Sequence, residues 1–208
     1  MTRGFRICAQ SSSFLRQAVA EEDADVTKHV LFVHGAGEGA YAEDSKLVAH
    51  LSEKLGHEYT VRYPRMPNEA DAEYPAWKRQ ICKELAVIGD GAILVGHSVG
   101  GSVLIRLLAD RDLQQSVAGL FLVATPFWYD HEVWRWDDVR LPKNVATLLP
   151  NALPLYLYHG REDEVAPVAH VDMYAELLPQ ATVRRLDGRN HQLNEDLSEV
   201  ALDIRELH

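Results

Sequence analysis

Cysteine is scarce in this sequence, and long apolar runs are missing altogether. Its two cysteines, Cys8 and Cys82, show neither a CxxC arrangement nor metal-ligand spacing. They therefore predict two reduced thiols and exclude a disulfide framework. No stretch approaches the ~18–20 consecutive apolar residues that a membrane-spanning helix needs. We therefore expect a cytoplasmic protein with no membrane partner.

Positive charge is also in short supply. The chain has 21 Lys and Arg against 31 Asp and Glu, which gives a formal net charge of −10. Proteins that bind nucleic acid neutralise phosphates with lysine and arginine, so we expect no nucleic-acid partner here. Apolar residues make up 47% and charged residues 25% of the 208 residues, which is typical of one globular domain.

The N-terminal segment differs in composition from the rest of the chain. Residues 1–28 contain arginines, serines and a group of acids, but no apolar core of a secretory signal. A transit peptide is one interpretation, and a short strand or a loosely attached arm is the favoured one. We expect an arm over residues 1–28 and a single domain over residues 29–208.

Six short apolar runs alternate with helical patterns in that domain. The expected strands are residues 29–33, 59–63, 92–95, 120–123, 155–158 and 182–186. The expected helices are residues 44–55, 74–88, 101–110, 168–178 and 196–207. Such alternation predicts an α/β fold with a mostly parallel sheet of about six strands and helices on both faces.

One connection is longer than the others and rich in aromatic residues. About thirty residues separate the strands that end near residue 123 and begin near residue 155. The aromatic residues are Phe127, Trp128, Tyr129, Trp134 and Trp136. One interpretation is a single helix whose aromatic side chains bury against the sheet. The other is a small lid that would make Trp134 and Trp136 candidate substrate-binding residues, and the two are compatible.

The stretch LVGHSVGGSVLI contains a candidate nucleophile, Ser98. An apolar run at residues 92–95 precedes Gly96-His97-Ser98-Val99-Gly100, and apolar residues at helical spacing follow. Strand, Gly-x-Ser-x-Gly and helix is the order of a nucleophile elbow. The turn is sharp, so a side chain at Gly96 or Gly100 would clash with neighbouring backbone.

A carboxylate and a histidine follow two later strands. Asp163 lies in HGREDEVAP after the fifth strand, and His191 lies in DGRNHQ after the sixth. A serine hydroxyl needs a histidine base that is oriented by a carboxylate. The order Ser98, Asp163, His191 is that of the nucleophile-elbow fold, so we predict a catalytic triad.

The turn HGAG after the first strand supplies the expected oxyanion hole. The amides of Ala36 and Val99 would donate to the developing oxyanion. His34 and His97 are candidates for shaping or lining the substrate site. The remaining histidines share no metal-ligand spacing, so we expect neither a metal nor a cofactor.

Each of these signals has a structural alternative when taken alone. Ser98 could be a turn serine, Asp163 a helix N-cap and His191 a loop histidine. Glu162 and Glu164 flank Asp163, and only the register of the turn favours the middle residue. The set in this order, with each member at the end of an expected strand, favours catalysis.

The motifs GHSVGG, HGAG, HGREDEVAP and NH resemble those of α/β-hydrolase-fold serine hydrolases over residues 29–208. Two further stretches are similar to those of small retinoblastoma-binding-protein-9-like hydrolases. One is the segment TVRYPRMPNEADAEYPAWKRQI, and the other is the long aromatic connection with WRWDDV, which we call the aromatic excursion. This resemblance implies a compact fold without a large cap domain, and a triad at Ser98, Asp163 and His191. Asn190 departs from the glycine usual before the histidine.

Two functions remain open at this point. The first is a serine hydrolase that cleaves a small or medium ester or amide through an acyl-enzyme on Ser98, with a small molecule as its partner. The second is a protein-interaction module on the same fold, with weak or no turnover and a protein partner. An exposed aromatic patch at Trp134 and Trp136 would favour the second function.

Overall fold

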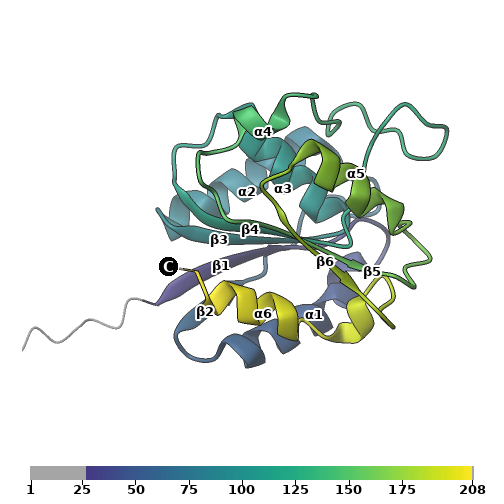
Figure 1. The fold of residues 1–208 in the computed structure, drawn as a ribbon. Coiled ribbons are helices and arrows are strands. Elements are labelled where there is room, and N and C mark those ends of the chain that lie inside the picture. The colour runs from purple at the N-terminus through teal and green to yellow at the C-terminus, as the bar shows by residue number, and fades with distance from the viewer. Residues whose placement is uncertain (1–26, 208) are drawn as a thin grey trace, which may run out of the picture.

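A computed structural model describes residues 27–207, which form an open sheet between two layers of helices (Figure 1). The strands are β1 Lys28–Val33, β2 Tyr59–Arg62, β3 Ala92–His97, β4 Val117–Val123, β5 Leu155–Gly160 and β6 Thr182–Leu186. The helices are α1 Ala40–Leu55, α2 Tyr74–Ile88, α3 Val99–Asp110, α4 Val145–Leu148, α5 Ala169–Leu177, the short 3-10 helix η1 Leu193–Glu195 and α6 Ser198–Arg205. All strand pairs are parallel, which confirms the predicted fold class.

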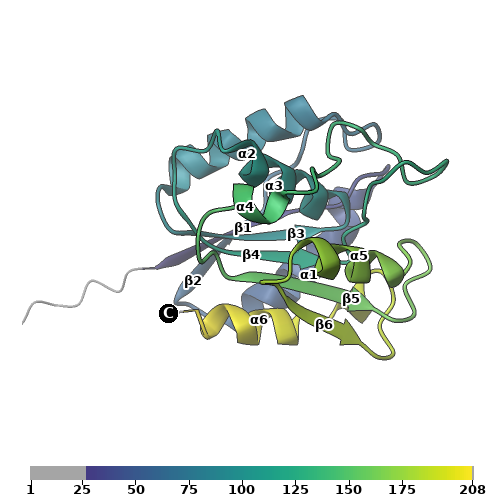
Figure 2. The ribbon, with the colours of Figure 1, turned by 45° about the horizontal axis from the view of Figure 1, so that its top comes forward.

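The strand order β2-β1-β3-β4-β5-β6 places the crevice of the sheet between β1 and β3. The chain adds β2 on one side of β1, then crosses to β3 on the other side and continues outward to β6. The loops after β1 and β3 therefore diverge at the carboxyl edge of the sheet (Figure 2). In open parallel sheets, ligands bind at such a switch point.

Alternate residues of the central strands enter two separate cores. Leu31 and Leu94 pack with side chains of α2 and α3, whereas Phe32 and Val95 pack with those of α1 and α6. Figures 1 and 2 show α2, α3, α4 and α5 on one face and α1 and α6 on the other. Burial on both faces explains why these strands are continuously apolar in sequence.

The long connection is irregular, so the expectation of one aromatic helix there is wrong. Between β4 and β5 the only helix is α4, which spans four residues and contains none of the aromatic side chains. Aromatic residues, histidine, valine and aspartate, which crowd residues 127–138, are all weak helix formers. Pro126 and Pro142 bound that stretch and lack the N–H that a helix interior needs.

The described part of the chain does not test the predicted arm. Residues 1–26 lie outside the described residues, and β1 begins at Lys28, one residue before the expected domain start. None of the helices in residues 27–207 combines the length and apolar character needed to cross a bilayer.

Candidate active site

Ser98 lies between β3 and α3 with a strained backbone. Its φ is 50° and its ψ is −124°. A residue other than glycine at positive φ is uncommon and costs on the order of 1–3 kcal/mol. Such strain persists only where the surrounding structure enforces it, and it is concentrated at functional sites.

Two glycines make this turn sterically feasible. A Cβ atom at Gly96 would lie 2.6 Å from the backbone of Gly101, and one at Gly100 would lie 2.3 Å from the carbonyl oxygen of Val33. Neither contact can be relieved by a side-chain rotation, because both neighbours are backbone atoms. The expected need for glycine on each side of Ser98 is confirmed.

His191 and Asp163 form a hydrogen-bonded pair at the same edge of the sheet. His191 follows β6, Asp163 follows β5, and Nδ1 of His191 lies 2.8 Å from Oδ2 of Asp163. Oδ1 of Asp163 accepts the amides of Val165 at 2.9 Å and Ala166 at 2.8 Å. The carboxylate is therefore anchored through one oxygen and presented to the imidazole through the other.

A second imidazole, that of His159, reaches the same carboxylate. Its Nε2 lies 3.1 Å from Oδ2 of Asp163 and 2.8 Å from the carbonyl oxygen of Ala166. Burial alone would raise the pKa of Asp163, but the hydrogen bonds from His159 and His191 outweigh it and hold that pKa well below its usual range. Sequence reasoning missed His159, whose only signal was its place four residues before Asp163.

Ser98 and His191 line one cavity of about 330 Å³. Its other lining residues are Gly35, Ala36, Ala40, Glu43, Asp44, His97, Glu164, Val165, Asn190 and Gln192. The structure thus brings Ser98, His191 and Ala36 to one cavity, with Asp163 behind the histidine.

The two expected oxyanion donors are close to Ser98 in different ways: Ala36 lines the same cavity, and Val99 directly follows Ser98 in sequence. Val99 is the first residue of α3, and the first amides of a helix have no acceptor within the helix. Ala36 belongs to the turn after β1, which the segment after β2 supports: the amide of Gly37 donates to the carbonyl of Glu69 at 2.7 Å, and the amide of Met66 donates to Nε2 of His34 at 2.9 Å.

His34 is placed inside the protein rather than at the substrate cavity. It is fully buried, accepts the Met66 amide through Nε2, and its Nδ1 lies 2.6 Å from the carbonyl oxygen of Gly35. Burial lowers its pKa, so the ring is neutral. His97 touches the cavity but is 1% exposed and hydrogen-bonds to Asp44 at 2.8 Å.

The profile of the alpha/beta hydrolase family matches residues 30–203, nearly the whole described chain. The chain belongs to the alpha/beta hydrolase family. No curated protein sequence matches it.

Solved structures of hydrolases share its fold. The meta-cleavage product hydrolase CumD of Pseudomonas fluorescens IP01 has a TM-score of 0.67 at 18% identity, over 86% of this chain and 90% of that one. A monoacylglycerol lipase of Paleococcus ferrophilus has a TM-score of 0.61 at 16% identity, over 86% and 92%. The ydeN gene product of B. subtilis has a TM-score of 0.62 at 15% identity, over 87% and 98%. At these identities the likeness concerns the fold alone.

In this alpha/beta hydrolase, Trp134 and Trp136 do not line the cavity beside Ser98. Both are half-buried. Trp136 packs edge-on against Trp128 at 5.5 Å, and Trp134 packs against His170 at 4.6 Å between ring centroids. The aromatic residues of the excursion therefore pack on one another and on the core. The exposed aromatic patch that would favour the interaction function is not formed by these two half-buried residues.

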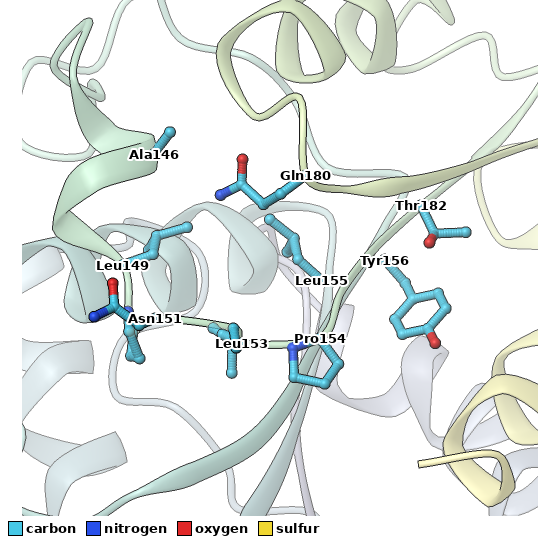
Figure 3. A pocket seen from close by; sticks show the side chains of 11 residues that line it. Ala146, Leu149, Asn151, Leu153, Pro154, Leu155, Tyr156, Gln180 and Thr182 are labelled. Atoms are coloured by element: carbon cyan, nitrogen blue, oxygen red, sulfur yellow. The ribbon is translucent and has the colours of Figure 1, made fainter. Parts of the chain in front are cut away.

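A larger cavity of about 460 Å³ lies at the other edge of this hydrolase's sheet, where β5 and β6 begin (Figure 3). The described residues around it include Leu153, Tyr156, Gln180 and Thr182, but no carboxylate, histidine or cysteine. It therefore lacks an acid–base pair that could activate a nucleophile. Within residues 27–207, no three His, Cys, Asp or Glu side chains are arranged to hold a metal ion.

Proposed function

We propose that this protein is a serine hydrolase that cleaves a small or medium ester or amide through an acyl-enzyme on Ser98. One observation carries the proposal: the strained Ser98 and the Asp163-bound His191 open into the same cavity. A hydroxyl beside an oriented imidazole is the arrangement that activates a serine. Family membership supports hydrolytic chemistry, and no step of the proposed reaction requires a metal or a cofactor.

The proposed reaction begins with proton transfer from Ser98 to His191. Nδ1 of His191 is occupied by Asp163, so Nε2 is the nitrogen left to take the proton. Ser98 Oγ then bonds to the substrate carbonyl carbon, and the amides of Ala36 and Val99 would stabilise the oxyanion by about 3 kcal/mol per donor. His191 returns the proton to the leaving oxygen or nitrogen as its bond to carbon breaks.

The second half of the reaction repeats the first with water. His191 takes a proton from a water molecule, the resulting hydroxide adds to the acyl carbon, and the ester bond to Ser98 breaks with return of the proton to Oγ. Asp163 keeps the imidazole oriented and stabilises its charged form throughout.

The substrate is expected to be small. The cavity of about 330 Å³ is at the lower end of the range for small-molecule sites, and residues 124–154 contain only the four-residue α4. We include in this proposal a place among the small retinoblastoma-binding-protein-9-like hydrolases. The small cavity and the lack of a large cap in residues 124–154 support it, as does the Met-Pro segment, whose Met66 amide donates to His34 at the start of the turn that carries Ala36.

Labelling by a fluorophosphonate probe tests the proposed nucleophile. Wild-type protein should label, and Ser98→Ala should not label while keeping its circular dichroism spectrum. Ser116→Ala is the matched control, because Ser116 is exposed in the loop before β4, and it should label as wild type does. Absence of labelling in folded wild type, or persistent labelling of Ser98→Ala, would refute the proposal. A panel of p-nitrophenyl esters and aminoacyl anilides would then define the substrate.

A further inference from the structure

A second histidine–carboxylate pair is buried beside the nucleophile. His97 is the last residue of β3 and directly precedes Ser98, and its Nδ1 lies 2.8 Å from Oδ2 of Asp44 on α1. Both side chains are 1% exposed. The proposed reaction does not use either of them. Burying two ionisable groups costs free energy unless their charges attract each other and their hydrogen bonds are satisfied.

The hydrogen bonds of His97 require a charged ring. Its Nε2 lies 3.1 Å from the carbonyl oxygen of His191, and a carbonyl oxygen can only accept. Oδ2 of Asp44 also only accepts when it is ionised. Both ring nitrogens must therefore carry protons, which makes His97 an imidazolium. Burial alone would lower the pKa of His97, but the charge and hydrogen bond of Asp44 outweigh it and raise that pKa.

Asp44 connects this pair to two further loops. Its Oδ2 accepts the amide of Gly35 at 2.8 Å, in the turn after β1 that carries Ala36. Its Oδ1 accepts Nε2 of Gln192 at 3.1 Å, next to His191. The loops after β1 and β6 and the elbow after β3 thus meet at one ion pair.

We propose that the ion pair of His97 and Asp44 positions the reacting groups of this site. It fixes the backbone of His191 through the His191 carbonyl and Gln192, and the oxyanion turn through Gly35, both relative to Ser98. The inference rests on the proposed function. His97 and Asp44 are positioning residues, because they act through His191 and Gly35 and not on the substrate.

The charges around the site are compatible with this role. The rings of His97 and His191 lie 5.0 Å apart between centroids, so a proton on His191 during catalysis places two imidazolium rings side by side. The two rings hydrogen-bond to different carboxylates, Asp44 for His97 and Asp163, which His159 also reaches, for His191. Each positive charge would therefore lie beside a carboxylate.

The rate of fluorophosphonate labelling tests the positioning role. Asp44→Asn and His97→Gln should each slow labelling by on the order of 10- to 100-fold, because small displacements of reacting groups have effects of this size. The double variant should be no slower than the slower single variant, because the two residues act as one unit. Additive losses, or unchanged rates in either folded single variant, would overturn the proposal.

Asp203→Asn is the matched control for burial. Asp203 is also 1% exposed, and it accepts from Tyr158 on β5 and Arg184 on β6. Its loss should lower the free energy of unfolding but leave the labelling rate of the folded protein within about twofold of wild type. An equal slowing in Asp203→Asn would mean that Asp44 matters only for stability, and would overturn the positioning role.

NMR of wild-type protein with ¹⁵N-labelled histidine gives an independent readout that needs no folded variant of Asp44. At pH 7.5 both ring nitrogens of His97, assigned by comparison with His97→Gln, should show the shifts of protonated nitrogens. A neutral ring would overturn the proposal even if labelling slows. If wild type does not label at all, the proposed hydrolase function is refuted. The ¹⁵N shifts still show in that case whether His97 is charged.

Discussion

Oδ2 of Asp163 lies 2.8 Å from Nδ1 of His191, which leaves Nε2 as the ring nitrogen that the proposed reaction would use. The other carboxylate oxygen is held by two backbone amides, so the carboxylate cannot rotate away without losing both. The neighbouring Glu162 and Glu164 are exposed. This arrangement favours Asp163 as the acid of the proposed triad.

Asp163→Asn should therefore slow labelling of Ser98 far more than Glu162→Gln. The amide cannot stabilise the imidazolium and can favour the wrong tautomer, so we expect a loss on the order of 10³- to 10⁴-fold. Glu162→Gln should stay within about twofold of wild type. The second-order labelling rate measures both, and the reverse ranking would move the acid by one residue.

Ser98→Gly should be more stable than Ser98→Ala. The φ of 50° and ψ of −124° at this position suit glycine and strain any residue with a Cβ atom. Relief of that strain should raise the free energy of unfolding by about 1 kcal/mol relative to Ser98→Ala. Urea unfolding of the two variants, both of which lack the hydroxyl, isolates the backbone effect. Equal stabilities would show that the turn is unstrained in solution.

His170 should make stability dependent on pH. It is 2% exposed, and burial lowers its pKa from 6.5 to about 4. Below pH 6.5 the unfolded chain binds a proton at His170 and the native protein does not until about pH 4. The stability that the neutral ring provides is therefore complete above pH 6.5 and is lost as the pH falls towards 4, by up to about 3 kcal/mol.

Urea unfolding at pH 7.5 and pH 4.5 measures this loss. Wild type and His170→Asn should differ in the size of the drop, because asparagine keeps an acceptor for the amide of Phe127, which donates to Nδ1 at 3.1 Å, but does not titrate. Parallel losses in the two proteins would assign the pH dependence to carboxylates alone.

His34→Phe should affect stability more than substrate binding. The phenyl ring can keep the edge-on packing with Tyr41 and Trp77, but it leaves the amide of Met66 without its acceptor. An unsatisfied buried donor costs about 1–3 kcal/mol. The free energy of unfolding should fall by that amount while KM for a p-nitrophenyl ester changes little. A raised KM at unchanged stability would instead support contact between His34 and the substrate.

The fold was predictable because its strands are recognisable without tertiary information. Buried parallel strands are short continuous apolar runs, and each was placed within a few residues of its observed position. Helix α1 begins at Ala40, earlier than the expected residue 44, because its N-cap is Gly39 in the left-handed region and not a residue with a capping side chain.

The supporting residues of the site were not predictable from local patterns. Asp44 hydrogen-bonds to Gln192, 148 residues away in sequence, and nothing in the spacing of either residue indicates the other. His34 was expected to shape or line the site, and only the tertiary structure separates these two roles. The aromatic excursion likewise has no helical or strand period, so its course depends on packing against α3 and α5.

The residues of the proposed active site come from two parts of the chain, which the connection between α3 and β4 separates. Ala36, Asp44, His97 and Ser98 precede the α3–β4 connection at residues 111–116, whereas Asp163 and His191 follow it. A cut in that connection would leave the nucleophile on one fragment and its base on the other. Covalent labelling of Ser98 would then report reassembly of two polypeptides, which makes this fold a candidate split enzyme for detecting protein proximity.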